Sequence, residues 1–518
     1  MSVFVSSDAW PRRFARTAAV VVAGLVLSPG EAALHSAETF RPQIPRVWDA
    51  EALRDLELPL AASGVPPEHV SPEYYYAQKV RPIYASYPVY HPDREPAGYF
   101  EGLKSVEPVV LWGEQEARPK LESEADWVRA GELVFDSPLG FQEMTPAARE
   151  SRATEMRTLP YRVTANGEVP FYRYVVREKG KIELGTLSCA ECHTRVMPDG
   201  NIIKGAQGNL PFDRQFACAI RTAPAAEMRS LQRLLFAAPW LNQPIISVVD
   251  SLSSDQIAAF HDSIPPGVLA RHGSGAYSPV QIPDLIGVTE RRYLDHTGLQ
   301  RNRGLGDLMR YAALNQGADL LSTFSGFIPD SDDAGKGRPD PKTRFRYSDE
   351  QLYALVLYLK NLRPPPNPNP LTELAQRGKA IFQEQECSRC HDPKQGYTNN
   401  KLAVAPGYTV PERHPARADI MKRQVETDSA LALQTRRGTG LYKVPSLRGV
   451  WYRGFFEHNG SCATLEDWFD PRRLDDNYVP TGWKGPLGTT TRPVKGHEFG
   501  LDLDATERAA LIAFLRTL

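Results

Sequence analysis

Two short segments of the chain carry cysteine and histidine at a spacing that suits one particular chemistry. In each, two cysteines are separated by two residues and a histidine follows at once: Cys189, Cys192 and His193, and again Cys387, Cys390 and His391. Such a CxxCH segment attaches a c-type haem, because the cysteines form thioether bonds to the porphyrin and the imidazole binds its iron. The sequence therefore predicts two covalently bound haems.

Other uses of these cysteines explain less of the pattern. A zinc site or a dithiol redox site is the alternative, but a zinc site built from the four motif cysteines would leave both adjacent histidines unexplained. The chain has six cysteines, so Cys218 and Cys462 remain. An oxidising compartment permits a disulfide between them, although the sequence does not show whether they meet.

The composition narrows the class of protein. With 518 residues the chain has material for two or three domains. Lys and Arg number 61 against 62 Asp and Glu, and this balance gives no indication of nucleic acid or an anionic membrane as a partner. The 44 prolines, the 38 glycines and a mean hydropathy of -0.40 predict a soluble protein rich in ordered loops.

The first residues have the pattern of an export signal. Three arginines precede an apolar run over residues 18–27, and helix-breaking and small residues follow. The run is too short to span a bilayer comfortably, so we expect residues 1–33 to be a cleaved signal peptide with no membrane span afterwards. A periplasmic or secreted location follows, and it agrees with the haem motifs, which are loaded outside the bacterial cytoplasm.

A proline- and tyrosine-rich stretch follows the signal. Over residues 38–120 neither a helical nor a strand period persists. We interpret it as an extended arm that wraps the folded body, with its tyrosines as amphipathic anchors. A role of these tyrosines in binding substrate is the alternative.

Two later regions begin and end alike. Residues 127–136 resemble the first helix of a cytochrome c domain, in which a glycine lets two helices cross closely, and residues 375–382 repeat the pattern. Residues 348–362 and 504–518 each have an N-cap followed by an apolar face at helical spacing. The matching starts, motifs and ends predict a duplicated domain.

The predicted fold is mainly α, with two cytochrome c-like helical domains, each around one haem, and long irregular loops. The first domain covers residues 121–363 and holds an insertion in which residues 171–176 predict a short β-hairpin. A proline-rich linker over residues 364–370 must be extended. The second domain covers residues 371–518.

The second domain carries further recognisable stretches. Residues 442–451 and 455–467 are similar to the proline-leucine-arginine stretch and the aromatic-histidine-glycine loop of bacterial diheme cytochrome c peroxidases and the methylamine-utilisation diheme enzyme. The resemblance covers roughly residues 122–518. The arm, the long first domain and residues 495–500 resemble more narrowly the diheme rubber oxygenases. Relatives hold a calcium ion between their domains, but no acidic cluster here has calcium-loop spacing.

The second haem needs an axial partner opposite His391. The peroxidases place a methionine after the aromatic-histidine-glycine loop, but residues 467–474 contain none, and Met421 is the only methionine of the second domain. His497, in a glycine-flanked loop, is the favoured ligand, and His458 is the alternative. Two histidines would give a low-potential haem suited to electron transfer.

For the first haem no strong second ligand is expected. Met197 follows His193 too closely to reach the opposite face easily. The remaining candidates have no flanking pattern that identifies a ligand, and ordinary packing is the alternative for each: Met228, Met309, His261, His272 and His296. An open position would let dioxygen or hydrogen peroxide bind at this iron.

A reactive haem also needs a surrounding pocket. Residues 292–298 and 306–314 could cover the first haem; an apolar cover would favour oxygenation, and an acid or base would favour peroxide cleavage. Tyr293, Tyr311 and Trp451 are candidate conduits for electrons, with core packing as the alternative for each. Arg448 is the candidate partner of a haem propionate.

These observations favour an exported diheme oxidoreductase that activates dioxygen or peroxide at the first haem. Oxidative cleavage of an apolar unsaturated substrate, implied by the narrower resemblance, is the leading specific hypothesis. A peroxidase supplied with electrons by a small cytochrome is the next. A non-catalytic diheme electron carrier and an enzyme that oxidises a partner protein at a distance are the alternatives.

Overall fold

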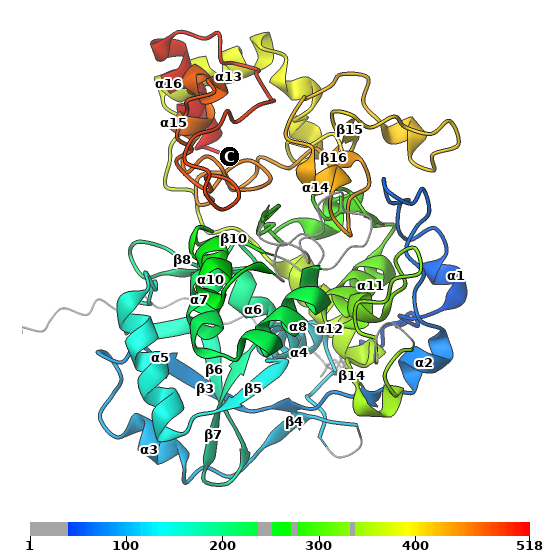
Figure 1. Cartoon of the computed structure of the whole chain (residues 1–518), viewed down its shortest axis with the longest axis vertical. Coiled ribbons are helices and arrows are strands. Elements are labelled where there is room, and N and C mark those ends of the chain that lie inside the picture. The colour runs from blue at the N-terminus through cyan, green and yellow to red at the C-terminus, as the bar shows by residue number, and fades with distance from the viewer. Residues whose placement is uncertain (1–39, 115–116, 237–250, 271–276, 332–336) are drawn as a thin grey trace, which may run out of the picture. The chain divides into compact units, whose positions relative to one another are not determined.

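Two pairs of crossing helices hold the two CxxCH motifs. In the computed structural model, which describes residues 40–114, 117–236, 251–270, 277–331 and 337–518, residues 41–518 form one compact unit. Helix α4 (Glu124–Asp136) packs against α12 (Asp349–Asn361), and α13 (Glu373–Glu384) packs against α16 (Ala505–Leu515) (Figure 1). All four begin at a side-chain N-cap, from Ser123, Ser348, Thr372 and Asp504. The four predicted helices are confirmed.

A glycine allows the close crossing in each pair. A Cβ atom added to Gly131 would lie 2.0 Å from the carbonyl oxygen of Ala354, and one added to Gly378 would lie 1.9 Å from that of Ala510. No side chain fits at such distances, so the two backbones touch only because these residues are glycines. One turn later the aromatic pairs Phe135–Tyr358 and Phe382–Phe514 meet, each with ring centroids 5.3 Å apart.

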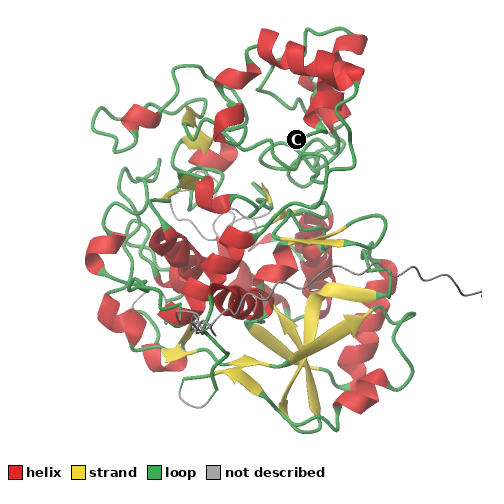
Figure 2. Cartoon of the chain, turned by 180° about the vertical axis from the view of Figure 1, so that it is seen from behind, coloured by secondary structure: helices red, strands yellow, loops and turns green. Residues whose placement is uncertain are grey.

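The insertion between α4 and the first motif forms a four-stranded antiparallel sheet. Its strand order is β3-β6-β7-β5, with bounds Ser86–Tyr90, Glu168–Glu178, Lys181–Thr186 and Gly140–Glu143. Figure 2 shows the strands of the molecule in yellow. Strands β6 and β7 are the predicted hairpin, but the sheet is larger, because β3 comes from the arm and pairs Tyr87 with Tyr174. With 34% helix and 14% strand, the fold is mixed, and the expectation of a mainly α fold is wrong in that respect.

The arm contains short elements that tie it to the body. They are α1 (Ala50–Leu53), α2 (Pro72–Tyr76), α3 (Tyr99–Leu103), β1 (Lys79–Val80), β2 (Ile83–Tyr84) and β4 (Val110–Trp112). Tyr75 is buried and stacks on Trp48, with ring centroids 4.5 Å apart and planes 9° apart. Strand β1 pairs in parallel with β14 (Phe345–Arg346), just before α12. Phe100 of the arm meets Tyr174 of β6 edge to face, with ring centroids 5.4 Å apart, so an aromatic side chain of the arm packs against the rest of the unit.

The remaining elements are short helices and two-stranded ladders. The helices are α5 (Pro146–Thr158), α6 (Cys189–Cys192), α7 (Phe212–Thr222), α8 (Ala225–Phe236), α10 (Ser254–Asp262), α11 (Leu305–Asn315), α14 (Ala430–Leu433) and α15 (Leu465–Trp468). The paired strands are β8 (Thr194–Val196) with β9 (Ile202–Lys204), β10 (Val268–Leu269) with β11 (Val280–Gln281), β12 (Tyr293–Leu294) with β13 (Gln300–Arg301), and β15 (Leu402–Val404) with β16 (Leu441–Lys443).

Two of the sequence predictions concern residues beyond this description. The signal peptide over residues 1–33 and the candidate ligand His272 lie outside the described residues. The linker over residues 364–370 runs without helix or strand between α12 and α13, and the domain boundary placed there stays a prediction. Within the described ranges, no helix combines the length and apolarity needed to cross a bilayer.

Candidate haem sites

The second CxxCH motif lies in the wall of a large cavity. Cys387 begins a short 3-10 turn (Cys387–Arg389) soon after α13, and His391 follows with its side chain buried. The main-chain oxygen of Tyr397 lies 3.1 Å from Nδ1 of His391. Because this contact engages Nδ1, Nε2 is the nitrogen left for a metal. Cys387, Cys390 and His391 all line the cavity.

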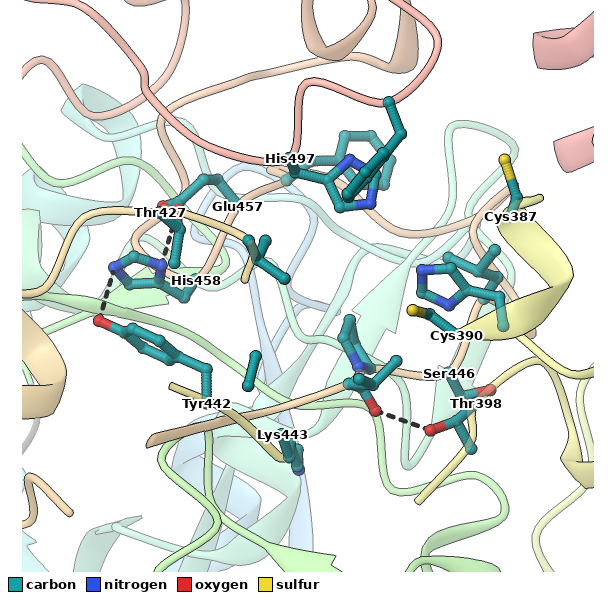
Figure 3. Close-up of a pocket in the computed structure, with 18 of the residues that line it drawn as sticks. Cys387, Cys390, Thr398, Thr427, Tyr442, Lys443, Ser446, Glu457, His458 and His497 are labelled. Atoms are coloured by element: carbon teal, nitrogen blue, oxygen red, sulfur yellow. Dashed lines mark hydrogen bonds and ion pairs between the residues drawn. The ribbon is translucent and has the colours of Figure 1, made fainter. Parts of the chain in front are cut away.

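His497 lines the same cavity opposite the motif (Figure 3). Its ring centroid lies 6.2 Å from that of His391. The main chain of its loop is fixed by the fully buried Arg473, whose Nη2 donates to the carbonyl oxygens of Gly496 and His497, each at 2.9 Å. Gly496 has a φ of +86°, and a Cβ there would lie 2.4 Å from Cα of Thr427, so glycine is required at this turn.

The spacing of the two imidazoles fits one iron between them. An imidazole nitrogen binds a metal at about 2 Å, and the ring centre lies about 1 Å behind it, so two rings on one iron have centroids roughly 6 Å apart. Burial lowers the pKa of His391, and it lowers that of His497 to about 3. Both rings are therefore neutral at physiological pH, the form that binds metals. The ligation itself stays a prediction.

The cavity wall near the two histidines is suited to a porphyrin. Apolar side chains dominate it: Phe382, Leu447, Val450, Leu465, Trp468, Phe499, Leu511 and Leu515. Met421 also lines the cavity, and Nδ2 of Asn399 donates to its sulfur at 3.4 Å. An apolar wall excludes water and favours burial of a flat hydrophobic ring.

His458, the alternative ligand, lies at the other end of the cavity, where Figure 3 shows it beside Tyr442. Its Nδ1 pairs with the carboxylate of Glu457, and its ring stacks on that of Tyr442 with centroids 4.7 Å apart. Burial would lower the pKa of His458, but Glu457 raises it. Burial would raise the pKa of Glu457, but His458 and hydrogen bonds from Asn459 and Thr427 lower it to about 2. Both ring nitrogens of His458 thus have protein partners.

Arginines line the cavity, but Arg448 is not among them. Nη1 of Arg448 forms an exposed ion pair with Glu290 at 2.7 Å. The lining arginines are Arg291, Arg423 and Arg453, which the sequence analysis did not single out. The signal that could have found Arg453 is its place in the same stretch as Arg448, between two aromatic runs.

The first CxxCH motif is enclosed by its own chain. Helix α6 contains both cysteines, and Ser188 caps it by accepting from the amide of Glu191 at 3.1 Å. The amide of Gly208 donates to the carbonyl oxygen of Cys192 at 3.0 Å, and a Cβ at Gly208 would lie 2.1 Å from that oxygen. The turn after β9 therefore packs its backbone directly on the motif.

Glu191, between the two cysteines, is a feature that the sequence analysis missed. Its side chain is buried, and its carboxylate accepts a hydrogen bond from the amide of Leu187. Burial raises the pKa of this carboxyl to about 7. Nε2 of Gln316 approaches Sγ of Cys189 at 3.7 Å, so the end of α11 reaches the motif.

Several candidate ligands of the first haem are engaged elsewhere. Nδ1 of His261 pairs with Asp213 at 2.7 Å, and its Nε2 lies 3.2 Å from the amide nitrogen of Gln232. Nε2 of His296 lies 2.7 Å from the carbonyl oxygen of Gln281, and the side chain of His296 lines the cavity of the second motif.

The methionine candidates differ in burial: Met197 and Met228 are partly buried, and Met309 is fully buried. Met228 packs against an apolar cluster that includes α7 and α10, and Met197 packs beside Tyr452. Met309 is fully buried in α11. The absence of a strong ligand opposite His193 stays a prediction.

The three candidate conduits have different surroundings. The hydroxyl of Tyr293 donates to Asp419 at 2.6 Å, and Tyr293 lines the cavity of the second motif. The hydroxyl of Tyr311 lies 3.5 Å from Asp295. Trp451 meets Tyr452 edge to face at 5.1 Å, in a cluster with residues of the 197–206 segment that follows the first motif. Trp451 therefore lies where the chain after one motif packs against the second half.

Two remaining expectations concern metal ions and thiols. Among the described residues, no group of three or more His, Cys, Asp or Glu side chains could hold a metal ion such as calcium. Cys218 and Cys462 are both free thiols, so the structure contains no disulfide between them.

Comparison with known proteins gives no family assignment. No protein-family model and no curated protein matches the chain. Among solved structures, hydrazine synthase from Kuenenia stuttgartiensis, pressurised with xenon, matches at 16% identity with a TM-score of 0.29, over 58% of this chain and 92% of that one. A MauG-like protein associated with microbial copper homeostasis matches at 21% identity with a TM-score of 0.23, over 33% of this chain and 56% of that one. Similarities this weak assign neither a fold nor a function to the chain.

Proposed function

We propose that the chain is an exported diheme oxidoreductase, with a bis-histidine electron-transfer haem at the second motif and a dioxygen- or peroxide-binding haem at the first. One observation carries the proposal: His391 and His497 face each other across a cavity with ring centroids 6.2 Å apart, next to a CxxCH pair. A c-type haem supplies one-electron chemistry and, where one axial position is open, a place for a small oxidant.

Groups of the protein itself would hold the two histidines of the second site in position. The carbonyl oxygen of Tyr397 orients His391, and Arg473 fixes the main chain at His497. The apolar side chains that line the cavity near the two rings would favour binding of a hydrophobic porphyrin there. Such a rigid site suits electron transfer, because its ligands need not move when the charge of the site changes.

The first motif supports the oxidant-binding role in a different way. Two of the candidate ligands contact other groups: His261 pairs with Asp213, and Nε2 of His296 lies 2.7 Å from the carbonyl oxygen of Gln281. A haem bound there through His193 alone would leave one axial position for dioxygen or hydrogen peroxide.

The proposal includes two specific reactions. Oxidative cleavage of an apolar unsaturated substrate is the leading reaction, motivated by the sequence resemblance to diheme rubber oxygenases, and peroxide reduction with electrons from a small cytochrome is the second. A non-catalytic electron carrier is favoured only by the paired imidazoles of the second site, since that arrangement alone needs no oxidant.

One spectroscopic experiment separates an enzyme from a carrier. The electron paramagnetic resonance spectrum of the oxidised holoprotein should contain one low-spin haem and one high-spin haem, and added cyanide should convert only the high-spin signal. Two low-spin haems whose spectra do not change when cyanide is added would identify an electron carrier.

A second experiment identifies the reaction. Carbonyl products from polyisoprene or a smaller alkene are measured beside peroxide turnover with reduced cytochrome; inactivity in both assays would contradict both reactions.

A further inference from the structure

Three arginines gather where the segments around the two motifs meet. Arg195 stands two residues after His193, Arg291 follows β11, and Arg453 follows the stretch around Trp451. The segments that carry them are joined by buried contacts.

These contacts tie the three segments together. The amide of Leu285 donates to the carbonyl oxygen of Gly205 at 2.7 Å. The side chain of Gln207, which is fully buried, accepts from the amide of Gly454 at 3.2 Å and from Nε2 of Gln281 at 3.3 Å. The three arginines, called the arginine cluster below, therefore share one interior region.

The arginine cluster donates to main-chain oxygens. Arg195 donates to the carbonyl of Gln207 at 3.4 Å, and Nη2 of Arg453 donates to that of Ser446 at 2.8 Å. Arg291 donates to the carbonyls of Asp284 and Ile286, at 2.5 and 3.1 Å. Within the described part of the chain, none of the three forms an ion pair with a carboxylate.

Negative charge in this region is scarce. The carboxylate of Asp284 is buried, but it accepts from the hydroxyl of Tyr452 at 2.6 Å and from the amide of Ile286 at 2.8 Å. Glu290 is paired with Arg448 on the surface. Burial lowers the pKa of Arg291, the carboxylate of Asp284 opposes this shift, and the positive charge of Arg453 adds to it. Three cations therefore share one nearby buried carboxylate, and buried cations without counter-ions are costly.

Two members of the cluster face the cavity of the second motif. Arg291 and Arg453 both line it, and Nε of Arg453 is buried without a hydrogen-bond partner among the described residues. A guanidinium presents parallel N–H donors that match the two oxygens of a carboxylate. The cavity thus offers an anion site on its arginine side and apolar walls beside His391 and His497.

We infer that Arg291 and Arg453, supported by the charge of Arg195, bind the propionate carboxylates of the porphyrin held between His391 and His497. This inference rests on the proposed function, since it needs a haem at the second motif. Arg291 and Arg453 thereby take the role that the sequence analysis gave to Arg448. The guanidinium of Arg448 is paired with Glu290 and does not line the cavity. Because Arg195 directly follows the first motif, the cluster also places one shared positive charge centre between the two motifs.

The test uses the purified holoprotein with both haems attached. Spectroelectrochemistry follows the second haem in the wild type and in Arg453→Gln, Arg453→Lys and Arg448→Gln. Loss of positive charge beside a propionate favours the ferric state, so Arg453→Gln should shift the reduced-to-oxidised equilibrium about tenfold toward oxidised, which is a 59 mV fall in potential for one electron. Arg453→Lys should stay within threefold of the wild type, and so should the control Arg448→Gln.

Each outcome decides between two statements. A wild type without a haem at the second motif would overturn the proposed function. A wild type with that haem, together with an Arg453→Gln variant whose potential is unchanged, or an Arg448→Gln variant with the larger shift, would overturn only the arginine assignment. If Arg453→Gln loses the haem, retention of haem and potential in Arg453→Lys supports the assignment, and loss in both variants contradicts it.

Discussion

The two motif regions share a frame and differ in what surrounds it. In each, a helix with a glycine crosses a second helix backbone to backbone, at Gly131 and Ala354 in the first region and at Gly378 and Ala510 in the second. An aromatic pair at 5.3 Å follows one turn later in both. The repeated frame positions a CxxCH segment near the crossing, but nothing in the frame supplies a second axial ligand.

The residues outside the frame make the two sites different. In the second region, His497 comes from a loop before α16, and Arg473 and Gly496 fix that loop beside the cavity. In the first region, residues 137–188 build a sheet between the helix and the motif, and the turn at Gly208 packs on the motif backbone. Under the proposed function, the repeated helices would position each haem motif, and the inserted loops would decide what its iron can bind.

The largest effect is expected from removing one set of thioether bonds. Cys387→Ala combined with Cys390→Ala should halve the covalently bound haem per chain, because under the proposed function each CxxCH segment would hold one haem independently of the other. The pyridine haemochrome absorbance per chain and the mass of the denatured protein measure this. The matched variant, Cys189→Ala with Cys192→Ala, should cause the same loss. An unchanged haem content in either variant would show that its segment is not an attachment site.

The next prediction concerns a substitution that would open an axial position at the second haem, as proposed for the first. His497→Ala should convert the second haem from low spin to high spin, because the only imidazole facing His391 among the described residues is removed. The amount of cyanide bound per chain should rise from one to two, and added imidazole should restore the low-spin spectrum.

The control for this change is His458→Gln. His458 lines the same cavity but is paired with Glu457 and Tyr442, so the low-spin signal should persist in that variant. A low-spin second haem in His497→Ala, lost in His458→Gln, would reverse the assignment of the ligand.

Sequence reasoning was most successful where local spacing decides the structure. The four helices and their crossing glycines follow from periodicity and N-caps, which act over a few residues. The sheet was predicted only as a hairpin, because its edge strand β3 comes from the arm and pairs with β6 across a long stretch of chain.

The dependence of side-chain position on the folded chain also explains why the sequence analysis chose Arg448 and not Arg453. Arg448 and Arg453 are five residues apart, and Gly449 between them adopts a φ of +75° that sends the chain into a tight turn. Which side chain reaches the cavity depends on that turn. His497 was singled out because a histidine between glycines before the last helix is visible in the sequence, whereas the burial of Glu191 depends on contacts that the sequence does not show.

A smaller effect concerns two buried carboxyls whose pKa values shift in opposite directions. Burial raises the pKa of Glu191 at the first motif, whereas His458 and its neighbours lower that of Glu457 from 4.5 to about 2. The contribution of Glu457 to stability is present above pH 4.5 and is lost as the pH falls toward 2. That of His458, whose pKa is raised, is complete below pH 6.5 and is lost as the pH rises through the raised value.

The pair should therefore stabilise the fold most between pH 4.5 and 6.5. Glu457→Gln should lower the free energy of unfolding at pH 5.5 by about 3 kcal/mol, and the difference should shrink toward pH 3. Urea unfolding at three pH values measures it. Glu466→Gln, which removes an exposed ion pair with Arg516, should cost less than about 1 kcal/mol at every pH. A pH-independent loss in Glu457→Gln would contradict the assigned shift.

The smallest effect tests the frame itself, and it should be equal in the two regions. Gly131→Ala and Gly378→Ala each place a Cβ about 2 Å from a carbonyl oxygen of the crossing helix, so the helices must separate. Each should lower the free energy of unfolding by about 1–3 kcal/mol, measured by urea unfolding of the holoprotein. Gly102→Ala in α3, where an added Cβ meets nothing within 4 Å, should change it by less than about 1 kcal/mol. A loss confined to one of the two crossing glycines would show that the regions do not depend on the same helix contact.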